Sequence, residues 1–476
     1  MNKIILTLAL TLELAFLFAI QCFAGDISYV MTYATGPYTK WTSAETQPSK
    51  GNTYTDSNAH TTSLRLTNYS SDTSGMFGMH TEYDWNPESS DGKYIALEGF
   101  GTLSAGGDYY LYTTTTSPAT LIKHINDYIT TDSGGSQQPE LRWDSSGNHP
   151  TWLYYRANSQ FRYLDVSDMS DHLRWDASTK IGSGKFIWSG DEGSSSEDSR
   201  YWVWMIAANG SGSSNAQGII TYDNVNNQMV SSMTMTTMDL NNVYVSKSGT
   251  YITTSVSKGS GTGRWAGTWS CKFSDLTALY QLFDDSKHMC PAYDYQGNDV
   301  LVYTGSHNSN GGGDTSNTDT VQFTRMDNGY TYPLYYYGDL DSTWSEWNDQ
   351  WHAPGLAKKG IAFVGSCNDT QTSWSTNQLF GFQLDENHTS STATSNWVWR
   401  LASAENICNG TYYYNQTNIS INTAGTKVYW GSDWRNSTGH SDTYVVQMPT
   451  NWYTDLFGGG GGSTSHTYAK ELWSKN

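Results

Sequence analysis

Positive charge is scarce in this chain. Its 476 residues include 26 Lys and Arg against 45 Asp and Glu, which gives a formal net charge of −19. Binding to phosphates needs a basic stripe, so the composition argues against nucleic acid as a partner. It also disfavours a strongly polyanionic ligand, unless cations or a local basic pocket compensate.

Cysteine is rare as well. Besides Cys22 near the N-terminus, the chain has only Cys271, Cys290, Cys367 and Cys408. None of them has a CxxC or CxxCH spacing, which excludes zinc-knuckle and c-type haem sites. In an exported chain these four could form two disulfides in three connectivities, and proximity in sequence favours Cys271–Cys290 and Cys367–Cys408.

Long apolar runs are absent except at the N-terminus. Residues 1–24 combine a short basic start, an apolar stretch and the small-residue ending Cys22-Phe23-Ala24. This pattern predicts a secretory signal peptide cleaved after Ala24, with an uncleaved signal anchor as the alternative. We therefore expect a secreted, cell-surface or periplasmic protein with no membrane span after signal removal.

The residues that are abundant favour β-structure. The chain has 45 Gly, 34 Tyr and 20 Trp, and it is rich in Ser, Thr and Asn. Long helices need Ala, Leu, Glu and Lys in quantity, whereas this mixture suits many short strands joined by polar turns. The sequence therefore predicts an all-β protein.

One short pattern recurs seven times: an apolar run, a polar turn carrying Gly or Ser, and a second apolar run. The interval between successive turns is 48 to 65 residues, which fits a four-stranded blade with elaborated loops. We predict a seven-bladed β-propeller of four-stranded antiparallel blades, with a count of six or eight as the alternative. The turns centre on Gly92, Gly147, Ser199, Gly249, Gly297, Gly360 and Gly425.

The segment 63–71, "SLRLTNYSS", precedes the first inner strand and has no blade of its own. We expect it to close the ring as the outermost strand of the last blade. The predicted organisation is a signal peptide (1–24), a lead-in segment (25–62), the propeller (63–453) and a Gly-rich flexible tail (454–476).

Two stretches resemble a known propeller family. Residues 64–99, "LRLTNYSSDTSGMFGMHTEYDWNPESSDGKYIALEG", are similar to the signature of TolB-type, WD40-like propellers, in which an RLT strand and a loop precede a W-(S/N)-P-x-DGKYIAF unit. "INTAGTKVYWGSDW" near 421–434 is also similar. The resemblance implies the propeller fold. It does not select a function, because the family contains both binding scaffolds and enzymes.

Residues just before the inner strands of a propeller are far apart in sequence but converge on one face, where ligands usually bind. Imidazoles with an amide or carboxylate there could hold a divalent metal such as Ca or Mn, so we predict a metal shell of His80, His288, Gln350 and His352. These polar residues could instead cap backbone groups or bind channel water. The other residues in equivalent positions are Glu82, Glu140, Arg142, Asp191, Glu192, Asn415 and Asn418.

The predicted metal shell is similar to that of the oligogalacturonate lyases, which are also seven-bladed propellers. In that family three histidines and a glutamine hold a metal that neutralises the substrate carboxylate, and the glutamine and two of the histidines share one loop. This chain has only Gln350 and His352 there, so His80 or His288 would complete the set. Elimination also needs a base near the proton beside the carboxylate. Catalytic candidates by residue type are Arg142, Tyr155, Arg156 and Arg162.

Aromatic side chains suggest a second kind of site. Exposed Trp and Tyr stack on the weakly apolar faces of sugars. We expect the tryptophans in Gly- and Ser-rich loops to bind glycan or, alternatively, to pack between blades, and we expect the "WVW" motifs at 202–204 and 397–399 to pack between blades. The candidate glycan-binding residues are Trp265, Trp269, Trp344 and Trp347, with Trp374 and Trp434 as further loop tryptophans.

These observations leave three functions open. The first is a secreted propeller that binds an extracellular polysaccharide or protein partner through the face where the inner strands begin. The second is a metal-assisted polysaccharide lyase that cleaves uronate-containing chains by β-elimination. The third is a structural cell-surface protein.

Overall fold

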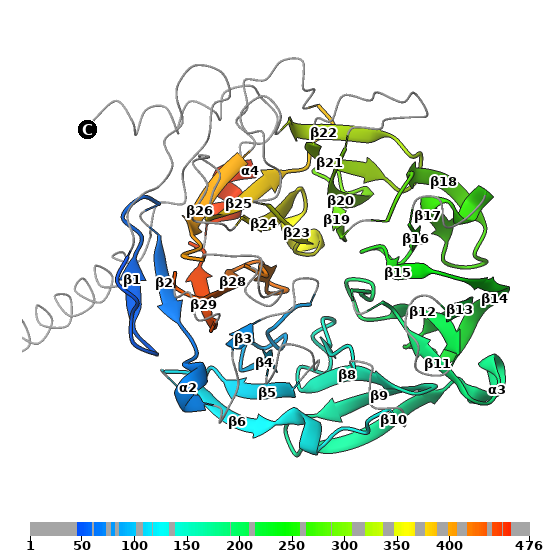
Figure 1. The fold of residues 1–476 in the computed structure, drawn as a ribbon, viewed down its shortest axis with the longest axis horizontal. Helices are drawn as coiled ribbons and strands as arrows, with labels where there is room; N and C mark the ends of the chain where they lie inside the picture. The colour runs from blue at the N-terminus through cyan, green and yellow to red at the C-terminus, as the bar shows by residue number, and fades with distance from the viewer. Residues whose placement is uncertain are drawn as a thin grey trace, which may run out of the picture.

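Small antiparallel sheets make up almost all of the structure, a computed structural model of the chain (Figure 1). Six sheets have four strands and one has five, and together they form the seven blades of a β-propeller, as predicted. The described residues are 45–59, 61–72, 78–80, 85–100, 108–116, 118–132, 139–190, 192–208, 215–257, 263–286, 288–306, 319–336, 347–366, 377–387, 398–406, 417–435, 440–449 and 451–457.

We number the blades along the chain and give their strands from the innermost outward. Blade 1 contains β3 (Gly78–His80), β4 (Tyr94–Phe100), β5 (Asp108–Thr113) and β6 (Thr120–His124). Blade 2 contains β7 (Arg142–Trp143), β8 (Trp152–Ala157), β9 (Gln160–Asp165) and β10 (Ser170–Asp176). Blade 3 contains β11 (Lys185–Trp188), β12 (Tyr201–Ala208), β13 (Ala216–Asp223) and β14 (Gln228–Met238).

The remaining blades follow the same order. Blade 4 contains β15 (Leu240–Val245), β16 (Tyr251–Val256), β17 (Gly267–Lys272) and β18 (Ala278–Phe283). Blade 5 contains β19 (Met289–Tyr293), β20 (Asp299–Ser306), β21 (Asp319–Arg325) and β22 (Thr331–Tyr336). Blade 6 contains β23 (Trp347–His352), β24 (Ile361–Ser366), β25 (Gln378–Gln383) and β26 (Val398–Ser403). Blade 7 contains β27 (Ser420–Ile421), β28 (Lys427–Ser432), β29 (Asp442–Gln447), β2 (Thr62–Arg65) and β1 (Thr53–Thr55).

The predicted N-terminal segment closes the ring through β2, but β1 rather than β2 is the outermost strand of the last blade. β2 pairs antiparallel with β29, so that Leu64 lies opposite Val445, and β1 adds a fifth strand from within the segment 25–62. At this junction the Arg65 guanidinium forms a buried ion pair with Asp442 at 2.6 Å. The closure thus joins the beginning of the propeller to its last blade by both a strand ladder and a charge pair.

The hydrophobic core is divided among the interfaces between blades. Each of the seven clusters of buried side chains in the described residues draws on two neighbouring blades. Trp202 and Trp204 lie in the cluster between blades 2 and 3, and Trp399 lies in the one between blades 6 and 7. These three tryptophans therefore pack between blades, as expected; Trp397 lies outside the described residues.

The same division explains an error in the expected disulfides. Cys271 lies in the cluster between blades 3 and 4, whereas Cys290 lies in the cluster between blades 5 and 6. Both are buried and neither forms a disulfide, so the predicted Cys271–Cys290 pair is wrong. Sequence proximity misled because a whole blade interface separates the two side chains. Cys367 and Cys408 lie outside the described residues.

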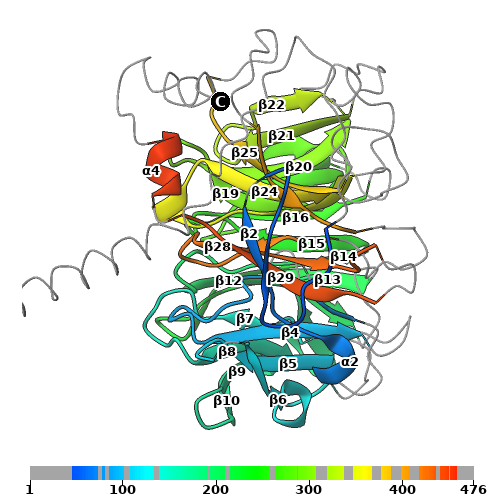
Figure 2. The same ribbon diagram turned by 90° about the vertical axis from the view of Figure 1, so that its left-hand side faces the viewer.

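Helical structure is limited to short pieces. The described helices are α2 (Tyr69–Asp72), α3 (Ser178–Ile181) and α4 (Trp452–Phe457), with 3₁₀ turns η1 (Ile125–Asp127), η3 (Gly263–Trp265) and η5 (Leu356–Lys358). α4 stands on one face of the ring (Figure 2). None of the described helices is long and apolar enough to cross a membrane. The predicted signal peptide and residues 458–476 of the predicted tail lie outside the described residues.

Candidate functional site in the central channel

A small cavity of about 70 Å³ lies on the axis of the propeller. Its lining comes from six of the seven blades, and only a position on the axis can meet so many. Ser145, Glu197, Lys247, Gly355 and Thr423 reach it from the turns between first and second strands. The cavity therefore lies at the face where the inner strands end, opposite to the face that the sequence favoured.

Arg142 supplies one positive charge to this cavity. Its side chain is buried, and the guanidinium lies over the Trp85 ring at 4.0 Å from the centroid. Nε donates a hydrogen bond to the Gly193 carbonyl at 3.0 Å, and Nη1 donates one to the Leu141 carbonyl at 2.9 Å. These contacts hold the charge in one place, which suits a site that must bind without rearranging.

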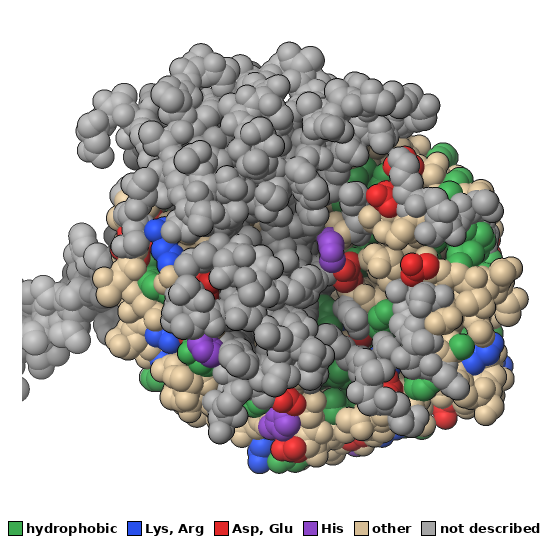
Figure 3. Space-filling model, viewed as in Figure 1, with side chains coloured by type: hydrophobic (Ala, Val, Ile, Leu, Met, Phe, Trp, Pro, Cys, Tyr) green, Lys and Arg blue, Asp and Glu red, His purple; other side chains and the backbone are tan. Residues whose placement is uncertain are grey.

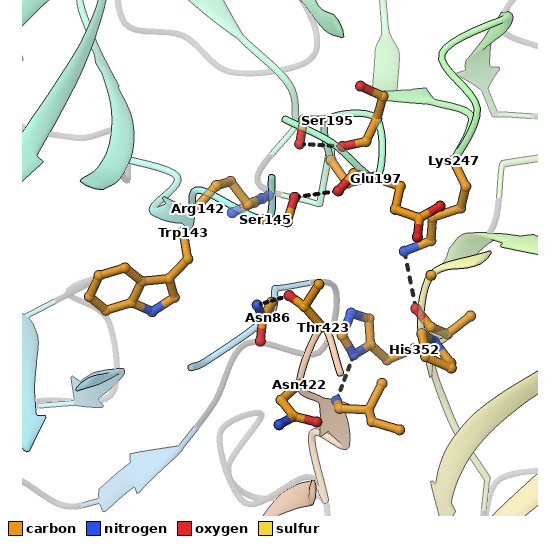
Figure 4. Close-up of a pocket in the computed structure, with 16 residues that line it drawn as sticks. Asn86, Arg142, Trp143, Ser145, Ser195, Glu197, Lys247, His352, Asn422 and Thr423 are labelled. Carbon is orange, nitrogen blue, oxygen red and sulfur yellow. Dashed lines mark hydrogen bonds between the residues drawn. The ribbon is translucent and has the colours of Figure 1, made fainter. Parts of the chain in front are cut away.

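Lys247 supplies the second positive charge from the turn of blade 4. Its Nζ donates to the Ala353 carbonyl at 3.0 Å, and its own carbonyl accepts a hydrogen bond from the Glu197 N–H at 2.8 Å. An ammonium group has three N–H donors. The ammonium of Lys247 can therefore bind a ligand while it keeps its contact with blade 6 (Figure 4).

His352 is the last residue of β23 and reaches the cavity as a neutral donor. Its Nδ1 accepts a hydrogen bond from the Ile421 N–H at 2.7 Å, so the proton of the neutral ring is on Nε2. Burial lowers the pKa of His352 well below its usual value, and the charges of Lys247 and Arg142 lower it further. The other ring nitrogen faces the cavity (Figure 4), where an Nε2–H group offers a donor to an oxygen atom.

Glu197 is the one acidic group among the described residues of the cavity lining, and neighbouring residues hold it. Glu197 Oε1 accepts a hydrogen bond from the Leu356 N–H at 2.6 Å, and its carboxylate also bonds to Tyr293. Arg142 and Lys247 therefore give the cavity a positive balance within a chain of net charge −19. Two cations with an imidazole N–H can hold a small anion such as a carboxylate.

His288 does not join His352 in this cavity. It directly precedes β19, and its Nδ1 lies 2.6 Å from Glu192 Oε1. Oε2 of the same glutamate accepts hydrogen bonds from Asn242 and Tyr244. His352 lies at the opposite end of the inner-strand layer, and a strand of five residues such as β19 spans roughly 16 Å.

The expected position of residues 350 and 352 also needs correction. Gln350 and His352 lie within β23 rather than in the loop before it, because the polar run 347–352 itself forms the inner strand. His80 is likewise in a strand, at the end of β3. The side chains of His80 and Gln350 are outside the described residues, as are Glu82, Asp191 and Asn415.

The described residues do not fit the predicted metal shell. His352 has its Nδ1 committed to a backbone N–H and its Nε2 protonated, and His288 is paired with Glu192 at the other end of the inner strands. A metal ligand must present an unprotonated nitrogen. Within the described residues, no group of three or more His, Cys, Asp or Glu is placed to hold a metal ion.

Of the four catalytic candidates, only Arg142 is in the cavity lining, and Arg162 instead pairs with Asp171 in blade 2. Tyr155 is buried in blade 2, where its hydroxyl donates to Asp171 at 2.6 Å and accepts a hydrogen bond from the Thr130 N–H. Burial raises the pKa of Tyr155, so its hydroxyl stays protonated at neutral pH and cannot accept the proton. Arg156 is buried too and forms an ion pair with Asp132. Both residues hold blade 2 together.

The described loop tryptophans pack at least partly against the protein, which was the alternative to glycan binding. Trp265 ends η3 and packs against the core between blades 3 and 4. Trp269 lies in β17, and its indole N–H donates to the Ala266 carbonyl at 2.9 Å. Trp434 packs against Tyr444 in blade 7. Trp344, Trp374 and the side chain of Trp347 lie outside the described residues.

Sequence reasoning missed Lys247 and Ser145, although the repeat contained a signal for both. Ser145, Glu197, Lys247 and Thr423 each stand two residues before the central Gly or Ser of their turn, and all four line the cavity. Equivalent turn positions converge on the axis. Comparing the residues two positions before each turn centre would have predicted a lysine, Lys247, in the channel.

Among the comparisons with known proteins, one solved structure supports the fold. No family model and no curated protein matches this chain. A crystal structure of oligogalacturonate lyase from Vibrio parahaemolyticus is similar at 10% identity, covering 84% of this chain and 97% of that chain, with a TM-score of 0.53. The C-terminal WD40 domain of Sif2 aligns at 10% identity over 79% of this chain and 81% of that chain, with a TM-score of 0.38. At this identity the likeness to the lyase shows a shared propeller fold and nothing further.

Proposed function

We propose that this protein is an exported binding module for an acidic saccharide and that it holds a carboxylate group in the channel cavity. The observation that carries the proposal is the meeting of Lys247, Arg142 and the neutral imidazole of His352 around a cavity of about 70 Å³. A basic pocket of this kind is the feature that an acidic chain needs to bind an anionic ligand.

The size of the cavity supports a single charged group rather than a whole sugar. Sugar pockets are commonly several times larger, so the saccharide ring would lie over the turns at the mouth. Ser145, Thr423 and Asn86 contribute hydroxyl and amide groups to the cavity lining (Figure 4). A uronic acid combines a carboxylate with such hydroxyl partners. The structural neighbour named as an oligogalacturonate lyase supports the choice of galacturonate oligomers as the first ligands to test.

Binding, rather than elimination, is the function that the described residues favour. A β-elimination needs a base. The described lining offers two cations, an imidazole whose Nδ1 lone pair is occupied by the Ile421 N–H, and the Glu197 carboxylate, which the Leu356 N–H and Tyr293 hold. Because the two described members of the predicted metal shell, His288 and His352, lie at opposite ends of the inner strands, we assign no step to a metal.

The test is calorimetric titration of the mature protein with trigalacturonate and with its methyl ester. Replacing Lys247 by Met removes one charge from the cavity and should weaken trigalacturonate binding about tenfold, as expected for losing a charged hydrogen bond. Lys272→Met is the matched control, because Lys272 is exposed at the end of β17. The control should bind like the wild type, and the ester should bind poorly to all three proteins.

Three results would contradict the proposal. They are no binding, equal binding of the ester, or an equal loss in both lysine variants. Appearance of ultraviolet-absorbing unsaturated products during the titration would instead indicate a lyase. A glycan array with acidic and neutral saccharides then identifies the natural ligand.

A further inference from the structure

A second, larger cavity of about 360 Å³ lies in the wedge between blades 7 and 1, away from the channel. Leu64, Leu66 and Val445 line it from the closing strands and Ile95 and Ala119 from blade 1. The cavity adjoins the cluster of buried side chains that blades 7 and 1 share. The ring-closing wedge thus contains space that the described side chains do not fill.

The wall of this cavity is apolar even where threonines line it. The hydroxyl of Thr61 donates to the Leu401 carbonyl at 2.8 Å, that of Thr116 donates to the Pro118 carbonyl at 3.0 Å, and that of Thr114 donates to the Gly92 carbonyl. Lys427, at the edge, is paired with the buried carboxylate of Glu88. Three of the five lining threonines and the lysine are therefore engaged within the protein, which favours a ligand without charge.

The neighbouring wedge shows what such a space accepts. Between blades 6 and 7, α4 places Trp452 and Phe457 in the buried cluster. The indole N–H of Trp452 donates to the Gly425 carbonyl at 2.9 Å, in the turn that precedes Lys427. The two wedges therefore flank the same blade, and the filled one is occupied by aromatic rings.

We propose that the cavity between blades 7 and 1 is a binding site for a neutral aromatic small molecule of about two fused rings. An apolar cavity of about 150 Å³ holds one benzene ring, so 360 Å³ accommodates an indole-sized ligand. Burial of an apolar ring would supply the binding free energy. This site does not depend on the channel cavity, and either could exist without the other.

The test is calorimetric titration of the mature protein with indole. Ala119→Leu fills the cavity from the blade 1 side, because Ala119 is buried in the adjacent cluster. Thr120→Leu is the matched control, since the neighbouring side chain is exposed and is not part of the lining. We expect one saturable site in the wild type and the control, and at least tenfold weaker binding in Ala119→Leu.

A crystal soak gives an independent reading if Ala119→Leu does not fold. Wild-type crystals soaked with 5-bromoindole should show an anomalous bromine peak between β29 and β4. The absence of saturable indole binding, unchanged affinity in Ala119→Leu, or bromine density elsewhere with this cavity empty would overturn the proposal.

Discussion

Burial acts in opposite directions on two titratable side chains of this protein. It lowers the pKa of His352, which lies in the channel, and raises the pKa of Glu405 to about 7. In both cases the charged form loses hydration that the surroundings only partly replace. For His352 the result is a neutral donor in the cavity. For Glu405 the result is a stability that depends on pH.

Glu405 should weaken the fold as the pH rises. Its carboxylate lies 2.6 Å from Arg435 Nε and accepts a hydrogen bond from the Glu45 backbone. Its folded pKa of about 7 lies above its ordinary value of 4.5, so its contribution is fully present below pH 4.5 and is lost as the pH rises through 7. We expect a loss of roughly 3 kcal/mol in the free energy of unfolding from this group.

Urea denaturation from pH 4.5 to 8 measures this contribution. Glu405→Gln cannot titrate, so its unfolding free energy should fall less than that of the wild type across this window. Glu386→Gln is a suitable control, since that carboxylate is partly exposed and pairs with Arg325 at the outer rim. If the free energy of unfolding changed with pH to the same extent in all three proteins, ionisation of Glu405 would not destabilise the fold, which would contradict the prediction.

The residue scale also shows how far the sequence could predict the site. Arg142 and His352 were among the candidates, and both line the cavity. Their partners could not be recognised, because the hydrogen bond from Ile421 to His352 joins residues 69 positions apart. The same bond fixes the tautomer of His352. A pattern of residue types therefore predicted a metal ligand where the geometry provides a donor.

At the scale of the element, the repeated turn is the best-predicted feature. All seven turn centres have positive φ, including Ser199 at 56°. Six of the seven centres are glycines. In four of these six turns the glycine N–H donates a hydrogen bond to the carbonyl three residues earlier, and the Ser199 N–H makes the same bond at 2.9 Å. Glycine accepts this conformation without strain, which explains why a glycine recurs at the turn centres and makes the repeat recognisable in the sequence. At Ser199 the side-chain hydroxyl accepts a hydrogen bond from the Ser145 N–H at 2.8 Å.

The loss in the free energy of unfolding when alanine replaces a turn glycine should depend on what the neighbouring blade places beside the new Cβ. A Cβ at Gly147 meets nothing within 4 Å, so Gly147→Ala should cost only the backbone term, about 1–2 kcal/mol. A Cβ at Gly249 would lie 2.1 Å from Tyr201 Cδ2, so Gly249→Ala should cost at least about twice as much. Chemical denaturation of the two variants tests this difference. Equal losses would mean that Tyr201 moves aside freely.

At the scale of the molecule, the ring depends on the junction of β2 with β29. Asp442 is buried and accepts hydrogen bonds from Arg65, Thr67 and the Tyr69 N–H. Asp442→Asn leaves the Arg65 charge without its partner, which typically costs about 3–5 kcal/mol for a buried pair. Since this junction holds the first and last blades together, we expect the whole propeller to lose stability.

Asp327→Asn provides the control for this charge pair. Asp327 pairs with Arg325 at 2.5 Å, but its side chain is 36% exposed, and exposed pairs contribute about 0–1 kcal/mol. Urea denaturation should therefore separate the two variants by several kcal/mol. Similar losses of unfolding free energy in the two variants would mean that the ion pair at the ring closure stabilises the protein no more than an exposed ion pair does.

The architecture could be predicted from the sequence, whereas the cavities could not. Seven turn signals and the unassigned strand at 63–71 were sufficient for the ring and its closure. The expected disulfide failed because Cys271 and Cys290 are near in sequence but belong to different blade interfaces. The cavity beside Ala119 likewise arises from the packing of two blades that are distant in sequence, and no local sequence pattern predicts that packing.

The most direct test of the central claim is a crystal structure of the protein with bound trigalacturonate. The account predicts density for a carboxylate in the channel cavity, within hydrogen-bond distance of Lys247 Nζ and His352 Nε2. Density for the sugar at the opposite face, beside His288, or carboxylate density that avoids Lys247, would contradict it.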